Sequence, residues 1–224
     1  MIRWISHALR FLFGVLLLPV AVAVSIVLYR QLISLQDIGS PQQFYFFYGI
    51  IAYSIFHLLI YRPAKLYIFS HELLHAVSSW LFGGKTKQFQ VTDKGGSVTT
   101  TKSNTFINLA PYLFPIYAIL IWLIYFLFSL FHNLERYTGP CLFLIGLSLA
   151  FHIIFTAELL KTKQRDLVKS GYLFSISIIY IVNISIVAFA LNLIFPSFSF
   201  VDFFKSSYQT VGDIYYFIFR QFFL

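Results

Sequence analysis

The sequence predicts an all-α polytopic membrane protein with about six transmembrane segments and one small membrane-associated β-hairpin. Of its 224 residues, 59% are hydrophobic and only 11% are charged, whereas a soluble domain has about 25% charged residues. Several apolar stretches also reach the roughly 20 residues that a helix needs to span a bilayer. The sequence lacks the short alternating segments of a membrane β-barrel. We therefore expect one membrane-embedded domain over residues 1–224.

The first apolar segment covers residues 11–29 (FLFGVLLLPVAVAVSIVLY). The tripeptide at 21–23 (AVA) resembles the cleavage site of a signal peptide, but the apolar run continues to Tyr29, which is long for the core of such a peptide. We therefore expect a retained span. A second span is expected at residues 44–61, where Arg62 and Pro63 follow.

The third segment, residues 64–82, precedes a polar stretch that differs from the rest of the chain. In this stretch, β-branched residues lie on both sides of the sequence DKGG at 93–96. Two short strands around a glycine-rich turn are typical of a β-hairpin. We expect the hairpin over residues 86–101, with Gly95 and Gly96 supplying turn conformations of positive φ.

Three more spans are expected in the second half of the chain, at residues 106–131, 140–160 and 172–195. A basic loop, residues 161–171, separates the last two. The tail, residues 198–224, is aromatic with scattered charges. It is either an interfacial amphipathic helix or a short last span.

The net charge of +8 is explained by Lys and Arg residues that flank the spans and set their orientation. No basic stripe is interleaved with a stacking motif, so we expect no nucleic-acid partner. The basic residues are densest in the hairpin and in the 161–171 loop, which we place in the cytoplasm. The single cysteine, Cys141, excludes an intramolecular disulfide and a metal site of several cysteines.

An H-E-x-x-H motif, formed by His71, Glu72 and His75, lies within the third segment. Residues four apart share a helix face, so both histidines can bind one ion, and neutral imidazole suits zinc. Glu72 is rotated by about 100° from His71 and can act there as a general base. An acid at bilayer depth costs roughly 2.5–3.5 kcal/mol, so a functional reason is expected. The alternative is that the three side chains only hydrogen-bond to other helices.

Four stretches together resemble the site-2 protease group of intramembrane zinc metalloproteases, and most closely its compact bacterial branch without a PDZ domain. They are FSHELLHAVSSWLFGGK, KGGSV, NLAPYLFP and HIIFTAELLKTKQRDLVKSG, within about residues 64–195. The resemblance implies zinc-dependent cleavage of membrane-spanning or membrane-associated proteins within or near the bilayer, in a bacterial inner membrane. It also implies that the hairpin presents the substrate in extended form. We expect four residues to contact the substrate: Val91, Ser97, Val98 and Asn108.

The third zinc ligand is expected to be Asp166. A catalytic zinc normally has three protein ligands and a water, and the better-known branch takes the third from an Asp-Gly that follows N-x-x-P. Here Asn108 begins N-x-x-P, but no Asp-Gly follows. The resemblance places an acidic residue at Asp166. Glu158 and His152 remain alternative ligands, and Asp166 could instead be a solvated loop carboxylate.

The expected function is that of a zinc-dependent endopeptidase in which Glu72 activates a zinc-bound water. A catalytically degenerate homologue that binds membrane proteins is the alternative; the missing Asp-Gly favours it and the intact Glu72 opposes it. A di-iron enzyme needs about eight histidines in several boxes, and the chain has six with one box. A transporter would show an inverted repeat, which the sequence lacks. The substrate and the oligomeric state stay open.

Overall fold

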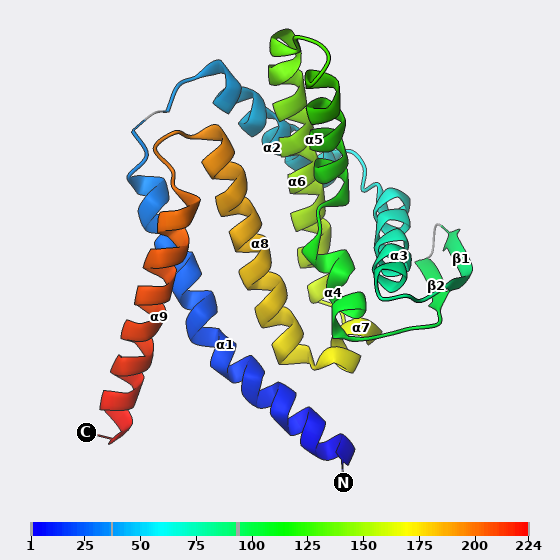
Figure 1. Ribbon diagram of the computed structural model, residues 1–224, viewed down its shortest axis with the longest axis vertical. Helices are drawn as coiled ribbons and strands as arrows, with labels where there is room; N and C mark the ends of the chain where they lie inside the picture. The colour runs from blue at the N-terminus through cyan, green and yellow to red at the C-terminus, as the bar shows by residue number, and fades with distance from the viewer. Residues whose placement is uncertain (1, 37, 93–94, 224) are drawn as a thin grey trace. The chain divides into compact units, whose positions relative to one another are not determined.

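The computed structural model describes residues 2–36, 38–92 and 95–223. Within them the chain is mostly helical, with one small two-stranded sheet, and it forms two compact units, Met1–Ile38 with Ser170–Leu224, and Gly39–Lys169. The elements are α1 (Ile2–Ile33), α2 (Pro41–Leu59), α3 (Ala64–Leu81), β1 (Thr86–Thr92), β2 (Gly95–Thr100), α4 (Thr105–Leu113), α5 (Ile116–Ser129), the 3-10 turn η1 (Glu135–Tyr137), α6 (Thr138–Leu160), α7 (Arg165–Ser170), α8 (Tyr172–Ile194) and α9 (Phe200–Phe223) (Figure 1).

The first unit is built from α1, α8 and α9, which lie side by side (Figure 1). Its core contains Val27 of α1 and Leu191 of α8, packed with Phe203 of α9. Gly14 lets α1 approach the start of α8 closely, because a Cβ there would lie 2.8 Å from the backbone nitrogen of Phe174. This unit is therefore held together by apolar packing.

The second unit contains α2 to α7 and the hairpin, and its central pair is α2 with α6. Gly49 of α2 and Gly146 of α6 each face the backbone of the other helix, so that a Cβ at either position would collide with it. Small residues let helix backbones approach closely in membranes. An aromatic cluster that includes Tyr67 and Phe155 then packs α3 against this pair.

The predicted number of about six membrane spans is not confirmed among the described residues. Three helical stretches are long and apolar enough to cross a membrane, at His7–Ile33, Glu135–Leu160 and Tyr172–Ile194. Two helix pairs pass the same test only jointly: α2 with α3, bent by 116°, and α4 with α5, bent by 70°. Counting each bent pair as one span gives up to five among the described residues, so six is not confirmed. The described helix α9 does not pass this test, and its interfacial placement stays a prediction.

Prolines explain both bends. The predicted span at 106–131 is divided where Phe114 adopts an extended conformation (φ −112°, ψ 115°) before Pro115, because a proline disfavours helical geometry in the residue before it. In the same way, Pro63 precedes the first residue of α3. The segments expected at 44–61 and 64–82 are thus two arms of a bent pair.

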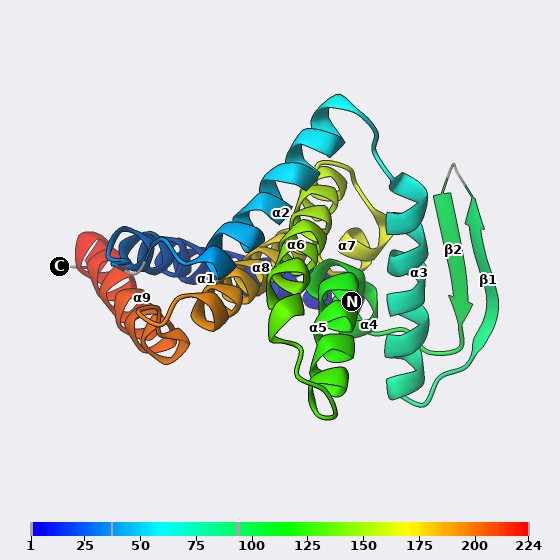
Figure 2. The ribbon, with the colours of Figure 1, turned by 90° about the horizontal axis from the view of Figure 1, so that it is seen from above.

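The predicted hairpin is confirmed as an antiparallel sheet, in which Phe89 pairs with Val98 and Val91 with Gly96. Its predicted turn includes residues 93 and 94, which lie outside the described residues. Viewed from above, β2 lies between α3 and β1 (Figure 2). The Phe89 ring packs against Phe69 of α3, with 5.9 Å between ring centroids. The sheet therefore rests on the helix that holds H-E-x-x-H.

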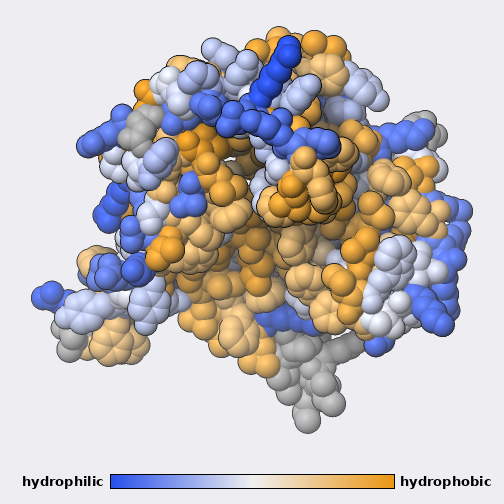
Figure 3. All heavy atoms as spheres, turned by 45° about the horizontal axis from the view of Figure 1, so that its top comes forward, coloured by the Kyte–Doolittle hydropathy of each residue, from blue (hydrophilic) through white to orange (hydrophobic). Residues whose placement is uncertain are grey.

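Hydrophobic side chains cover much of the surface shown in Figure 3, with hydrophilic residues gathered toward its margins. On α1, for example, Phe11, Leu12 and Phe13 are 64%, 53% and 55% exposed. Large exposed apolar patches are rare on soluble monomers and mark contact with a membrane or a partner. The exposed faces of the helices are therefore suited to lipid.

We expect Gly146→Ala to destabilise the protein by about 1–3 kcal/mol, the usual cost of inserting a methyl group into a well-packed interface. Thermal unfolding in detergent, followed by circular dichroism, measures the change. Gly212→Ala on α9 is the matched control, because its Cβ would meet open space and alanine favours helix. Equal unfolding temperatures for Gly146→Ala and the parent protein would contradict the close α2–α6 packing.

Candidate metal centre

Helix α3 positions the two motif histidines on one face. It begins after Pro63 and ends before Gly83, whose positive φ of 71° suits glycine. The side chains of His71 and His75 are only 12% and 11% exposed, and their ring centroids lie 4.9 Å apart. The spacing of four residues thus places two imidazoles together, as the sequence predicts.

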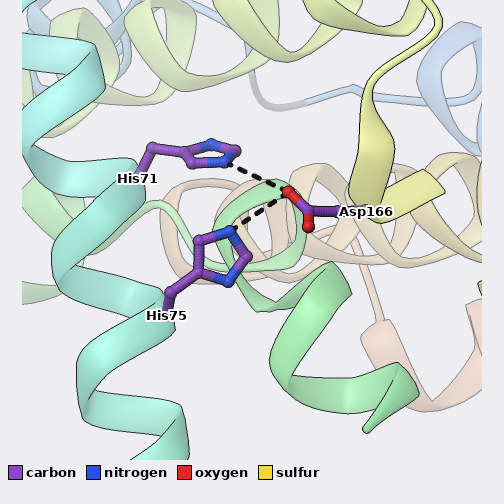
Figure 4. Close-up of side chains that lie close together, drawn as sticks. All are labelled: His71, His75 and Asp166. Atoms are coloured by element: carbon purple, nitrogen blue, oxygen red, sulfur yellow. Dashed lines mark ion pairs between the residues drawn. The ribbon is translucent and has the colours of Figure 1, made fainter. Parts of the chain in front are cut away.

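Asp166 reaches the same point from a different element, α7. Leu167, which is fully buried, anchors this short helix, and the neighbouring Asp166 points at the histidines (Figure 4). Its Oδ2 lies 3.3 Å from Nε2 of His75 and 3.9 Å from Nε2 of His71. The structure therefore brings together the three residues that the sequence nominates as metal ligands.

The three side chains fit a zinc ion in chemistry and in spacing. Each offers one ligand atom, and these atoms lie within 4.8 Å of one another. Ligands about 2.0–2.1 Å from a tetrahedral ion lie roughly 3.3 Å apart, and two histidines with a carboxylate leave one position open for water, as in catalytic zinc sites. This group could therefore hold a catalytic zinc.

A backbone contact orients His75 for that role. Its Nδ1 lies 2.8 Å from the carbonyl oxygen of Ile107 on α4, which can only accept a hydrogen bond. Nδ1 therefore holds a proton, and Nε2 is the nitrogen that faces Asp166 and could bind a metal. On the other side, the ring of the fully buried Tyr112 packs edge-on against His71, with 5.1 Å between centroids. Helix α4 thus fixes both imidazoles.

The carboxyl group of Asp166 is held in its ionised form. Burial alone would raise its pKa, but hydrogen bonds with His71 and His75 and their positive charge outweigh this, so the pKa lies well below its usual range. A charge-assisted hydrogen bond stabilises the carboxylate. An ionised carboxylate is the form that binds a metal, so Asp166 is already in the protonation state that a metal ligand needs.

Glu72 lies beside this group, under the hairpin. The side chain is buried, and its carboxylate accepts a hydrogen bond from the backbone N–H of Val98. A Cβ on Gly96 would lie 2.7 Å from Cγ of Glu72 and 3.0 Å from its Oε1. Gly96 therefore lets strand β2 lie directly on the predicted base. The expectation that both glycines have positive φ holds for Gly95 but not for Gly96.

The predicted substrate-contacting residues occupy different positions. Val98 lies on β2 above α3 with its N–H on Glu72, whereas Val91 lies on the outer strand β1. Ser97 is exposed and, between Gly96 and Val98, its side chain leaves the opposite face of the sheet. Asn108 is buried on α4. Their contact with a substrate stays a prediction.

The two alternative ligands lie elsewhere. Glu158 is bonded to His57 and Arg62, and the group that could hold a metal among the described residues does not include it or His152. His152 is buried and lines a cavity of about 10 Å³ with Ser70 and Ser148. The geometry therefore favours Asp166 over both.

The structure adds Ile107, Tyr112 and Gly96 to the site, which sequence reasoning missed. Ile107 contributes its backbone carbonyl, which every residue has, so the residue type does not reveal this role. Tyr112 follows Asn108 by four residues and so shares its helix face, and that spacing could have indicated it. Gly96 has the appearance of an ordinary turn residue.

Comparison with known protein families agrees with this geometry. The family model described as Peptidase M50B-like matches residues 45–201. The chain belongs to this family. The resemblance to site-2 protease-like metallopeptidases is thereby confirmed at the level of the family, and the match includes His71, Glu72, His75 and Asp166. No curated protein and no solved structure matches the chain. Family membership and the apolar helices together make it an integral membrane protein.

We expect purified protein to bind about one zinc per chain, and His75→Ala and Asp166→Ala to lose it, because each removes one of three ligands. Elemental analysis of protein prepared without chelators measures the ratio. His132→Ala and Asp202→Ala are matched controls at exposed positions and should keep the parent value. Retention of zinc by Asp166→Ala would exclude Asp166 as a ligand.

Proposed function

We propose that the chain is a zinc-dependent intramembrane endopeptidase that cleaves membrane-spanning or membrane-associated proteins. The observation that supports this most directly is the convergence of His71, His75 and Asp166 on one point, with the buried Glu72 beside it. Membership of a metallopeptidase family agrees with it. A bacterial inner membrane is the proposed location, on the basis of the resemblance.

The two histidines and Asp166 would hold the ion and leave one side of it open to water. Zinc bound there would lower the pKa of a bound water to roughly 7 and polarise the peptide carbonyl. The residues of the chain do the rest. Glu72 accepts a proton at its carboxylate as the water oxygen attacks the carbonyl carbon. It then passes this proton to the amide nitrogen, which leaves as an amine when the C–N bond breaks.

The hairpin is suited to holding the substrate as an extended strand. Strand β2 pairs with β1 along one edge only, and hydrogen-bonding directions alternate along a strand. Since the N–H of Val98 points to Glu72 on the other edge, the backbone groups of Gly96 and Thr100 face that edge too. A substrate strand paired with this edge would take over the N–H of Val98 from Glu72 and lie beside that carboxylate with its peptide bonds exposed.

Asn108 has a supporting place in this arrangement. Its Oδ1 accepts a hydrogen bond from Ser103 Oγ at 3.0 Å, which orients the side-chain amide. A side-chain amide can stabilise the oxyanion of a tetrahedral intermediate. By contrast, Asn104 acts as a helix cap, because its Oδ1 accepts the N–H of Ile107 at 2.8 Å.

The test is cleavage of a reporter protein with one transmembrane segment, co-reconstituted with the enzyme in liposomes. We expect Glu72→Gln to abolish cleavage, a loss of at least 10²–10⁴-fold for a general base, while zinc content stays at the parent value. Glu135→Gln, an exposed glutamate, is the matched control and should remain active.

The outcomes separate the two candidate functions. The peptidase proposal is supported if the parent cleaves the reporter, if Glu72→Gln does not, and if a chelator abolishes cleavage. A zinc-loaded parent that retains the reporter without cutting it would support the degenerate binding homologue instead. Equal cleavage by the parent and Glu72→Gln would exclude Glu72 as the base.

We expect Gly96→Ala to reduce cleavage at least tenfold without loss of zinc, because the added methyl displaces Glu72 but touches no ligand. Thr99→Ala, at an exposed position of the same strand, is the control. The reporter assay and zinc analysis together measure the effect. Unchanged cleavage in Gly96→Ala would show that the contact between the hairpin and Glu72 is not required.

A further inference from the structure

A second polar cluster, which runs from the buried Tyr53 and His57 to the partly exposed Glu158 and the exposed Arg62, lies where α2 and α6 end, outside the candidate metal centre. The Tyr53 hydroxyl lies 2.9 Å from Nδ1 of His57, and Nε2 of His57 lies 3.2 Å from Oε1 of Glu158. The same carboxylate oxygen lies 3.4 Å from Nη1 of Arg62. The His57 side chain is only 1% exposed. A buried polar group is tolerated when it is hydrogen-bonded, as His57 is on both ring nitrogens, and the proposed hydrolysis does not use this cluster.

The cluster joins three parts of the second unit. Tyr53 and His57 belong to α2, and Glu158 to the last turn of α6. Arg62 lies in the non-helical connection of residues 60–63, two residues before α3 begins. Through its contact with Arg62, Glu158 therefore connects the end of α6 to the segment just before α3, the helix that carries both histidines.

This is the place at which the two halves of the metal group are connected. One half, His71 and His75, belongs to α3, whereas Asp166 lies on α7 and is reached from α6 through residues 161–164. Any movement of the α6 end relative to the start of α3 would change the distance from Asp166 to the histidines. The observed spacings of 3.3 and 3.9 Å leave little tolerance for such movement.

Aromatic contacts continue from the cluster to the metal group. The Phe155 ring lies edge-on to His57, with 5.1 Å between centroids, and stacks on Tyr67 at 4.8 Å. Tyr67 lies one turn before His71, and their rings are 5.9 Å apart. Packed side chains therefore fill the whole path between the Glu158 carboxylate and the first histidine.

We propose that Glu158, with His57 and Arg62, is a positioning device that holds α3 and the α6–α7 segment at the spacing that one metal ion needs. The proposal rests on the proposed function, since it assumes that His71, His75 and Asp166 bind zinc. Glu158 and His57 act through the ligands and touch neither substrate nor metal. They are thus positioning residues and not catalytic residues.

The test compares zinc affinity in Glu158→Ala, Glu158→Gln and the parent, by competition with a chelator in detergent. We expect binding in Glu158→Ala to be weaker by up to about tenfold, which is the lower end of the effect for a partner bonded directly to a ligand. Glu158→Gln keeps an oxygen acceptor for His57 and Arg62 and should recover part of the affinity. Thr138→Val is the control: it removes a 2.7 Å polar contact with Tyr125 at the other end of α6, and should bind zinc as the parent does.

A spectroscopic readout reports the geometry independently of activity. The visible absorption of the Co²⁺-loaded protein depends on the number and arrangement of ligands, so Glu158→Ala should alter the spectrum and Thr138→Val should not. If Glu158→Ala does not fold, Arg62→Gln decides the question. The Arg62 side chain is 62% exposed, so its loss is tolerated, and a smaller weakening of zinc binding is expected.

If folded Glu158→Ala binds zinc as tightly as the parent and has the same Co²⁺ spectrum, the positioning role of Glu158 is overturned. The peptidase proposal would not be affected by that result. The same result in Arg62→Gln, where Glu158→Ala fails to fold, would also overturn the positioning role. A parent that binds no zinc at all would overturn both proposals.

Discussion

A metal ion in this protein would have to draw its ligands from two separate segments, and the rest of the second unit is arranged around that constraint. His71 and His75 come from one helix, which automatically presents residues four apart on one face. Asp166 comes from a six-residue helix that could not hold a fixed position alone. Its place depends on burial of Leu167 and on the attachment of α6 to the neighbouring helices. The close approach of α2 and α6 supplies part of that attachment, and we propose that the polar cluster at the end of α6 supplies the rest.

The same packing also supplies hydrogen-bond partners for the polar side chains of the site, which offset the free-energy cost of burying them in an apolar protein. The imidazoles, Glu72 and Asp166 are each bonded to one another or to backbone: His75 to the carbonyl of Ile107, Glu72 to the N–H of Val98, and Asp166 to both histidines. Backbone partners come from α4 and β2, which cover α3 on two sides. The hairpin therefore contacts Glu72, the proposed general base, and is the strand pair on which we propose that an extended peptide binds.

The sequence indicated most of the residues that the structure brings together at the candidate site, because its signals are local. A spacing of four residues needs only a helix to place His71 beside His75, and β-branched residues around glycines need only a turn to form a hairpin. Asp166 was predicted from the family resemblance and from the number of ligands that zinc requires. What could not be predicted depends on tertiary contacts: the backbone bond of His75, the pairing of Glu158 with His57, and the approach of Gly96 to Glu72. The span count is not confirmed for a related reason. Pro63 lies between two apolar runs that the sequence presents as separate spans, and Pro115 interrupts a run that it presents as one span, so that each pair of helices is bent.

The most direct test of the metal centre is the zinc X-ray absorption spectrum of Asp166→Cys, measured beside that of the parent. A cysteine in place of a ligating aspartate should add one sulfur to the zinc shell, at a distance of about 2.3 Å. The parent should show only nitrogen and oxygen neighbours, because its one cysteine, Cys141, is outside the metal-ligating group. Sulfur in the spectrum of the variant alone would place residue 166 on the metal. A shell of nitrogen and oxygen in both proteins, with zinc bound at the parent level, would contradict the account of how α3 and α7 together build this site.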